Sequence, residues 1–180
     1  MTMTMTRTRT RTQRRIVELA EAVGETLLAR RLSLATAESC TAGGVAYAVT
    51  QVAGSSQWFD RGFVTYSNAA KRQVLGVSAT ELRLYGAVSE PVARAMARGA
   101  LVASDAQLAV GITGIAGPGG GSEDKPVGLV CFSWALRRAG ELRLRTESRR
   151  LSGDRAAVRS QAIIVALEGL LQVLAENADV

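Results

Sequence analysis

Short apolar runs alternate along this chain with longer segments in which apolar residues recur at helical spacing. The runs at 33–37, 62–66 and 107–113 have the length and composition of strands, and the segments between them have the periodicity of helices. Consecutive strands that are joined by helices lie parallel in one sheet, and the helices pack on its faces. The alternation therefore predicts an α/β fold.

The last third of the chain breaks this alternation. Residues 127–136 form an apolar run, and 141–151 alternate Leu142 and Leu144 with mostly polar residues, as in a partly exposed edge strand. Arg138-Ala139-Gly140 lies between them, a sequence typical of a hairpin turn. An antiparallel hairpin added to parallel strands makes the sheet mixed. The chain has 180 residues and no internal repeat, so we expect a single domain, a three-layer α/β/α sandwich with a mixed sheet.

The helix boundaries follow from capping residues. Ser67, Ser78 and Ser89 each precede a helical segment, and a serine at this position accepts a hydrogen bond from a free backbone N–H group of the first turn. We expect helices at 13–31, 69–75, 79–84, 89–103 and 155–175. A further helix is expected after the first strand and its turn, ending at about Val52.

Residues 1–12 repeat Met-Thr and then Arg-Thr, and we expect them to form a disordered leader ahead of a domain that spans 13–180. The net charge of +6 falls to +3 without the leader arginines Arg7, Arg9 and Arg11. A basic tail can bind nucleic acid, but the rest of the chain has no basic stripe with interleaved aromatic residues. Nucleic acid is therefore not the expected partner.

The chain contains no histidine, and of its 22 basic residues only Lys71 and Lys125 are lysine. The absence of histidine excludes Ser-His and Cys-His nucleophile pairs and histidine-ligated metal sites. The two cysteines, Cys40 and Cys131, have no metal-ligand spacing, and we expect both to be reduced thiols. We find neither a secretory signal nor an apolar run long enough to span a membrane, so we expect a cytoplasmic protein without membrane contact.

The segment 37–44 follows the first strand and predicts a tight turn into a helix. Ser39 would lie at the carboxyl end of the strand, where open α/β sheets bind ligands, and free N–H groups near Thr41 would favour an anion or a developing oxyanion. Gly43 and Gly44 would let a ligand approach the backbone closely. Two other interpretations remain: Ser39 or Thr41 caps the helix, and the glycines only permit close packing.

Two neighbours of Ser39 have chemistry of their own. Cys40 is a rival nucleophile, although without histidine it would need the helix dipole or Lys71 to form a thiolate. Glu38 is either a general base or a structural hydrogen-bond acceptor beside the end of the sheet.

Tyr66 ends the second expected strand, and Lys71 lies in the first turn of the next helix. An ammonium group at that position faces the positive end of the helix dipole, and partial burial would disfavour its charge further. Both effects favour a neutral amine that takes the proton of Ser39, with Tyr66 relaying the proton or holding the amine. The alternative is a solvated lysine on the surface.

Residues 113–122 are rich in glycine and follow the third strand. Consecutive unhindered N–H groups in such a loop can form a concavity for a phosphate or a carboxylate. The loop lacks the Gly-Lys-Ser/Thr ending of a Walker P-loop, and a flexible linker is the alternative interpretation. Lys125 is a second candidate for the base, but we expect it to be exposed and paired with Glu123 or Asp124.

Taken together, these segments resemble the C-terminal domain of the competence-damage-inducible CinA proteins. The similarity covers about 13–174, and the motifs that carry it are Lys71 and the segments 37–44, 62–68, 86–90, 114–118, 125–128 and 152–155. The resemblance implies an amidohydrolase of pyridine nucleotide recycling that converts nicotinamide mononucleotide to nicotinic acid mononucleotide and ammonia. It also implies a serine nucleophile, Ser39, with Tyr66 and Lys71 as its activating partners and no metal or other cofactor.

The phosphate of such a nucleotide would lie on the glycine-rich loop and near Arg155. The residues expected to bind the substrate are Cys40, Thr41, Gly43, Gly44, Gly114, Ala116, Gly117 and Arg155. The alternative function is a non-catalytic nucleotide-binding or partner-binding module of the same fold. The sequence leaves open whether the protein forms a homo-oligomer.

Overall fold

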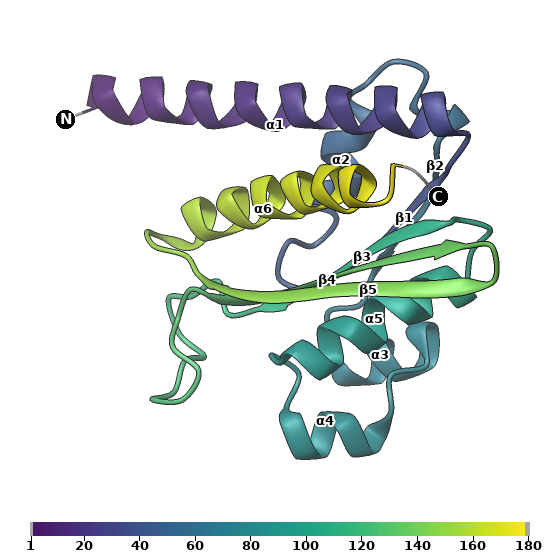
Figure 1. Ribbon diagram of the computed structural model, residues 1–180. Helices are drawn as coiled ribbons and strands as arrows, with labels where there is room; N and C mark the ends of the chain where they lie inside the picture. Colours follow the sequence, from purple (N-terminus) through teal and green to yellow (C-terminus); the bar gives the residue numbers. More distant parts are fainter. Residues whose placement is uncertain (1, 179–180) are drawn as a thin grey trace.

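The computed structural model describes residues 2–178 and contains one five-stranded sheet with helices on both faces (Figure 1). The strands are β1 (Leu34–Glu38), β2 (Phe59–Val64), β3 (Leu108–Gly114), β4 (Leu129–Arg138) and β5 (Glu141–Arg150). They follow the order β2-β1-β3-β4-β5, in which β2, β1 and β3 are parallel and β4 is antiparallel to β3 and β5. The expected mixed sheet is confirmed.

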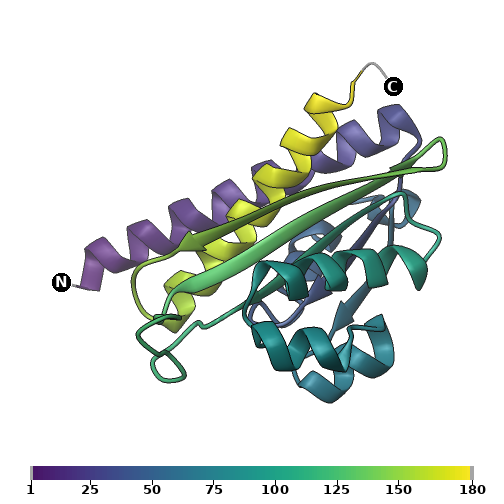
Figure 2. The same ribbon diagram turned by 60° about the horizontal axis from the view of Figure 1, so that its bottom comes forward.

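The helices form two layers that enclose this sheet. The helices of one layer are α1 (Thr2–Arg30), α2 (Gly44–Thr50) and α6 (Arg155–Glu176), and those of the other are α3 (Asn68–Leu75), α4 (Ala79–Tyr85) and α5 (Glu90–Val102). A short 3-10 turn, Ser55–Gln57, precedes β2. In both views α1 runs beside α6 over the sheet (Figure 2). The expected three-layer α/β/α sandwich is confirmed.

The apolar core beneath α6 fixes this helix to the sheet. Trp134 of β4 stacks on Phe132 with ring centroids 5.8 Å apart, and its Nε1 donates to the carbonyl oxygen of Ala166 at 2.9 Å. By length and composition alone α6 could cross a membrane, but residues such as Val158, Ala162 and Leu170 pack in this core. A core helix of this kind needs no membrane to cover its apolar side.

On the opposite face, α3 packs closely against α5. Gly99 of α5 lies so near Leu75 that a Cβ atom at Gly99 would stand 2.1 Å from the Leu75 carbonyl oxygen. A residue without a side chain is therefore required for this approach. At the other end of α3, Ser67 Oγ accepts a hydrogen bond from the Ala70 N–H group at 3.0 Å, as expected of a cap. The two ends of α3 are thus held in place, one by each contact.

The first helix is longer than expected. α1 begins at Thr2 rather than at Gln13, so the segment expected to be a disordered leader continues the helix. Residues 2–12 contain neither glycine nor proline, and nothing in their sequence ends a helix. The division of the chain into a leader and a domain at residue 13 stays a prediction.

The second strand is displaced from its expected position. It spans Phe59–Val64 rather than 62–66, because its pairing with β1 begins at Leu34 and Phe59. As an edge strand β2 is mostly exposed, and its sequence carries little apolar alternation from which to predict its ends. Tyr66 consequently lies beyond the strand.

Candidate active site

Residues 39–43 turn the chain from β1 into α2. The N–H group of Ser39 donates to the Ile112 carbonyl oxygen of β3 at 2.9 Å, which fixes Ser39 at the carboxyl end of the parallel strands. Ala42 and Gly43 have φ angles of 52° and 86°, and these left-handed conformations reverse the chain within a few residues. Glycine adopts such a conformation without the strain that a side chain causes. Ser39 is therefore held on a tight turn and is only 8% exposed.

The start of α2 is capped by Glu38, the last residue of β1. This residue is fully buried, and its carboxylate accepts hydrogen bonds from the N–H groups of Val45 at 3.1 Å and Ala46 at 2.9 Å. The interpretation of Ser39 or Thr41 as the cap is therefore wrong, and the buried Thr41 hydroxyl has no hydrogen-bond partner among the described residues. Of the two roles considered for Glu38, structural acceptor is the one that the structure supports.

The amine of Lys71 is in contact with the hydroxyl of Ser39. Its Nζ lies 3.0 Å from Ser39 Oγ and 2.8 Å from the carbonyl oxygen of Thr65. Lys71 is 1% exposed, which rules out a solvated surface lysine, and burial lowers the pKa of its ammonium group. A neutral amine here carries a lone pair within reach of the serine proton, which is the geometry that a general base requires.

Tyr66 does not contact this amine. Its side chain is 59% exposed, and its hydroxyl accepts a hydrogen bond from Nη2 of Arg155 at 2.9 Å. The backbone carbonyl of Thr65, the preceding residue, holds the amine of Lys71 instead. The expectation that Tyr66 holds the amine of Lys71 is therefore wrong. The contact between Tyr66 and Arg155 was not predicted from the sequence.

Arg155 links Tyr66 to the glycine-rich loop. Its Nη1 donates to the carbonyl oxygen of Gly117 at 3.0 Å, and Gly117 has a φ of 81°. Ala116 beside it is buried, and Gly114 ends β3 so close to β4 that a Cβ atom would lie 2.8 Å from the Leu129 carbonyl oxygen. Arg155, at the start of α6, thus joins the glycine-rich loop, on which the substrate is expected to bind, to the segment that follows β2.

Gly44 packs against a helix. A Cβ atom at Gly44 would lie 2.6 Å from Cδ1 of Ile163 on α6, so the missing side chain admits Ile163 to this position. Close packing, the alternative considered for this glycine, is what the structure shows. Gly43 faces more open surroundings, with Val64 at 3.4 Å from an added Cβ atom.

Lys125, the other lysine, is engaged away from Ser39. Its amine donates to the backbone carbonyl of Tyr85 at the end of α4, rather than to Glu123 or Asp124 as expected. The contact ties the far end of the glycine-rich loop to α4. Lys71 is therefore the lysine that the fold brings to the serine.

Cys40 is expected to be a poor nucleophile. It is 5% exposed, and burial raises the pKa of its thiol to about 11. At pH 8 only about one thiol in a thousand would then be thiolate. We expect iodoacetamide to alkylate Cys40 in the folded protein at least tenfold more slowly than in urea, as followed by mass spectrometry of the peptide containing it. Equal rates in the folded and unfolded protein would contradict this assignment.

A second arginine of α6 also contacts the Ser39 turn. Nη2 of Arg159 donates to the carbonyl oxygen of Thr41 at 3.0 Å. This contact was not anticipated from the sequence because its acceptor is a backbone carbonyl, which carries no residue signature. The spacing of four residues from Arg155, which places both arginines on one side of a helix, was the available signal.

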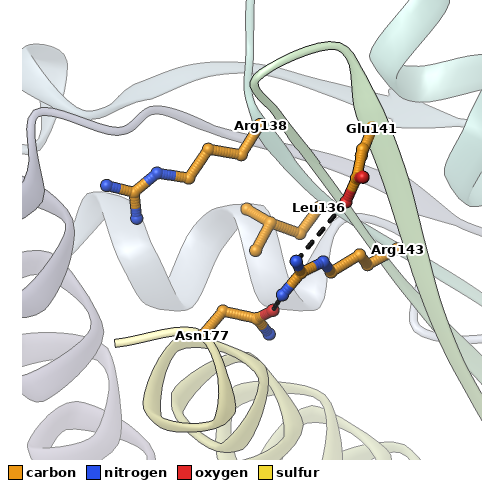
Figure 3. Close-up of a pocket in the computed structure, with 5 residues that line it drawn as sticks. All are labelled: Leu136, Arg138, Glu141, Arg143 and Asn177. Atoms are coloured by element: carbon orange, nitrogen blue, oxygen red, sulfur yellow. Dashed lines mark hydrogen bonds and ion pairs between the residues drawn. The ribbon is translucent and has the colours of Figure 1, made fainter. Parts of the chain in front are cut away.

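A shallow surface hollow lies elsewhere, at the β4–β5 turn (Figure 3). It is lined by Leu136, Arg138, Glu141, Arg143 and Asn177. Arg143 crosses it and donates to Asn177 and Glu141. The strand register places Leu136 beside Leu108 and Leu34 at the start of β1, the end opposite to Ser39. Among the described side chains, no group of three metal-binding residues gathers at either place.

The class that fold and site define is an α/β/α domain with a buried serine–lysine pair at the carboxyl end of its parallel strands. Residues 16–174 match the CinA C-terminal domain family. The chain belongs to this family, which confirms the resemblance inferred from the motifs.

Relatives and solved structures agree with this membership. The chain is 55% identical over 162 residues to nicotinamide-nucleotide amidohydrolase PncC of Escherichia coli strain K12, covering 90% of this chain and 96% of that protein. It is 50% identical over 158 residues to the protein of the same name from Pseudomonas putida, covering 88% and 96%. The crystal structure of competence/damage inducible protein CihA from Agrobacterium tumefaciens matches with a TM-score of 0.83 at 46% identity, over 88% of this chain and 95% of that one.

Proposed function

We propose that the protein hydrolyses the carboxamide of nicotinamide mononucleotide to give nicotinic acid mononucleotide and ammonia. The observation that carries the proposal is the 3.0 Å separation of Ser39 Oγ and Lys71 Nζ. It occurs in a chain without histidine, whose relatives at 50% and 55% identity are named nicotinamide-nucleotide amidohydrolase. A serine nucleophile in such a chain needs another base, and a buried lysine can serve as one. We assign the reaction to pyridine nucleotide recycling in the cytoplasm.

The reaction would proceed through an ester of Ser39. The serine oxygen adds to the amide carbon while its proton passes to the neutral amine of Lys71. The tetrahedral intermediate then collapses, the C–N bond breaks, and ammonia leaves with the proton that Lys71 returns. Water, deprotonated by the same amine, attacks the ester and releases the carboxylate product and Ser39.

The negative oxygen of the intermediate requires hydrogen-bond donors near Ser39. The Glu38 carboxylate already occupies the N–H groups of Val45 and Ala46, so these cannot serve. The N–H groups of Cys40 and Thr41 favour the thiolate form of Cys40, although burial, the larger effect, raises the pKa of that thiol. Donors that favour an anion on this turn support an oxyanion site at the N–H groups of Cys40 and Thr41.

The nucleotide phosphate is assigned to Arg155 and the glycine-rich loop. Arg155 lies at the surface, and a guanidinium group can bind phosphate through two parallel hydrogen bonds. Its contacts with the Tyr66 hydroxyl and the Gly117 carbonyl hold it between the segment that follows β2 and the glycine-rich loop. Tyr66 is then placed to contact the substrate rather than the amine, and this is its proposed role.

The Arg155→Ala variant should distinguish nucleotide from nucleoside. We expect KM for nicotinamide mononucleotide to rise about 10- to 100-fold, because a charge-assisted hydrogen bond to phosphate contributes about 1.5–3 kcal/mol. The KM for nicotinamide riboside, which has no phosphate, should change less than about twofold. Steady-state kinetics on both substrates checks this, and an equal rise for the two would contradict a phosphate contact.

The proposed function itself is tested by an ammonia assay across nicotinamide mononucleotide, its nucleoside and free nicotinamide. We expect the mononucleotide to be hydrolysed fastest, with one equivalent of ammonia for each nicotinic acid mononucleotide. Binding of the mononucleotide by calorimetry without any product would favour the alternative, a non-catalytic nucleotide-binding module of the same fold.

A further inference from the structure

A buried negative charge lies directly before the proposed nucleophile. Glu38 is fully buried and adjoins Ser39 in sequence. Burial raises the pKa of the thiol of Cys40, which follows Ser39, and the charge of Glu38 raises this pKa further. A second negative charge on the Ser39 turn is therefore disfavoured by Glu38. Amide hydrolysis at Ser39 creates such a charge in its tetrahedral intermediate.

A positive charge on α6 opposes this effect. Arg159 donates from Nη2 to the Thr41 carbonyl oxygen at 3.0 Å, which brings its guanidinium group to the Ser39 turn. Its charge acts on Cys40 in the direction opposite to burial and to Glu38. None of the ion pairs formed among the described side chains includes Arg159, so no carboxylate neutralises it. Its Nε is buried and lacks a hydrogen-bond partner within the described part of the chain.

The same face of α6 also holds the turn mechanically. Ile163, one helical turn after Arg159, fills the space left by Gly44, where an added Cβ atom would lie 2.6 Å from Ile163 Cδ1. The Thr41 hydroxyl makes no hydrogen bond to a described residue, so this side chain does not anchor the turn. Contacts from Arg159 and Ile163 therefore position the segment between Ser39 and α2.

We propose that Arg159 is a positioning residue for hydrolysis at Ser39. It holds the Thr41 carbonyl so that the neighbouring N–H groups keep their direction, and its charge offsets that of Glu38 when the oxyanion forms. The inference rests on the proposed amide hydrolysis. Since the oxyanion exists only after attack, Arg159 acts on the chemical step and not on substrate binding.

Two substitutions differ in whether they keep the charge. Arg159→Gln removes the charge and leaves an amide donor on a shorter side chain, whereas Arg159→Lys keeps the charge. We expect kcat to fall about 10- to 100-fold in Arg159→Gln with KM changed less than about twofold, and to stay within about fivefold of wild type in Arg159→Lys. The matched control is Arg15→Gln on α1, which removes an exposed arginine paired with Glu168 and should leave kcat unchanged.

Three results would overturn the proposal. They are wild-type kcat in Arg159→Gln, a rise of KM at constant kcat, and equal losses in Arg159→Gln and Arg159→Lys. A readout that needs no amide substrate comes from phenylboronic acid, whose boron gains an oxygen bond to Ser39 and becomes an anionic tetrahedral centre as the proton moves to Lys71. Its affinity, measured by boron NMR, should fall about tenfold or more in Arg159→Gln and recover in Arg159→Lys.

Different results contradict the proposed hydrolysis of nicotinamide mononucleotide and the proposed role of Arg159. Wild-type protein that releases no ammonia from nicotinamide mononucleotide contradicts the proposed function. Boronate affinity then still tests Arg159, because the adduct requires Ser39 and its surroundings but not the nucleotide. Unchanged boronate affinity in Arg159→Gln contradicts the role of Arg159 whatever the substrate is.

Discussion

Replacement of Ser39 by alanine is expected to abolish ammonia release from nicotinamide mononucleotide. The substitution removes the atom proposed to attack the amide carbon, and loss of a serine nucleophile lowers kcat by about 10³-fold or more. The fold should be retained, because the hydroxyl contributes one hydrogen bond, worth about 1 kcal/mol, with Lys71. Steady-state ammonia assays and thermal unfolding of the same preparation measure both effects.

A buried serine elsewhere in the sheet provides the matched control. Ser133 on β4 is fully buried and bonds to Thr146 and to the Arg145 carbonyl, two strands away from β1. Ser133→Ala should lower the free energy of unfolding by about 1 kcal/mol and leave kcat near the wild-type value. Wild-type turnover in Ser39→Ala would contradict the assignment of Ser39 as the nucleophile. An equal loss of kcat in Ser39→Ala and Ser133→Ala would contradict it as well.

Replacement of Lys71 by methionine should remove activity and stabilise the protein. Methionine has a similar length and can fill the same buried space, but it cannot accept the serine proton. Burying an amine disfavours its protonated form, which is why burial lowers the pKa of Lys71. We expect kcat to fall about 10³-fold or more, with a thermal midpoint at pH 7 equal to or above that of the wild type. A variant that is both inactive and strongly destabilised would contradict this pairing of effects.

The pH dependence of stability follows from the same shift. The folded-state pKa of Lys71 lies below its ordinary value of 10.5, so the unfolded chain binds the proton more tightly. The stability of the wild type should therefore rise relative to Lys71→Met as the pH increases from the lowered pKa to 10.5, and the difference should be constant below that window. Urea unfolding of both proteins between pH 6 and pH 10 measures the difference. Parallel curves throughout would show that the pKa of Lys71 is not lowered by folding.

Much of the fold was predictable because its signals are local. Ser67, Ser78 and Ser89 cap the helices that follow them, since a serine before an amphipathic segment is a signal carried by a few adjacent residues. The ends of β2 were missed because an edge strand with exposed residues has little apolar alternation. The start of α1 was missed because a repeat of threonine with methionine and arginine has no strong propensity of its own.

Side-chain identities located part of the site, and backbone atoms form the rest. The scarcity of lysine in a histidine-free chain singled out Lys71, and the structure brings it to Ser39. The acceptors for Lys71 and Arg159 are the carbonyl oxygens of Thr65 and Thr41, and any residue type could supply them. Such contacts become visible only when the chain is folded, because they depend on where the main chain passes rather than on what it carries.

The packing of Gly99 against Leu75 lets α5 influence the position of the helix that carries Lys71. Lys71 and Leu75 belong to the same short helix, and that helix can pack this closely on α5 only because position 99 lacks a side chain. A methyl group at position 99 would have to displace the Leu75 carbonyl, and α3 would shift away from α5 or tilt. The distance between the Lys71 amine and Ser39 therefore depends partly on the missing side chain at Gly99, although α5 supplies no catalytic group.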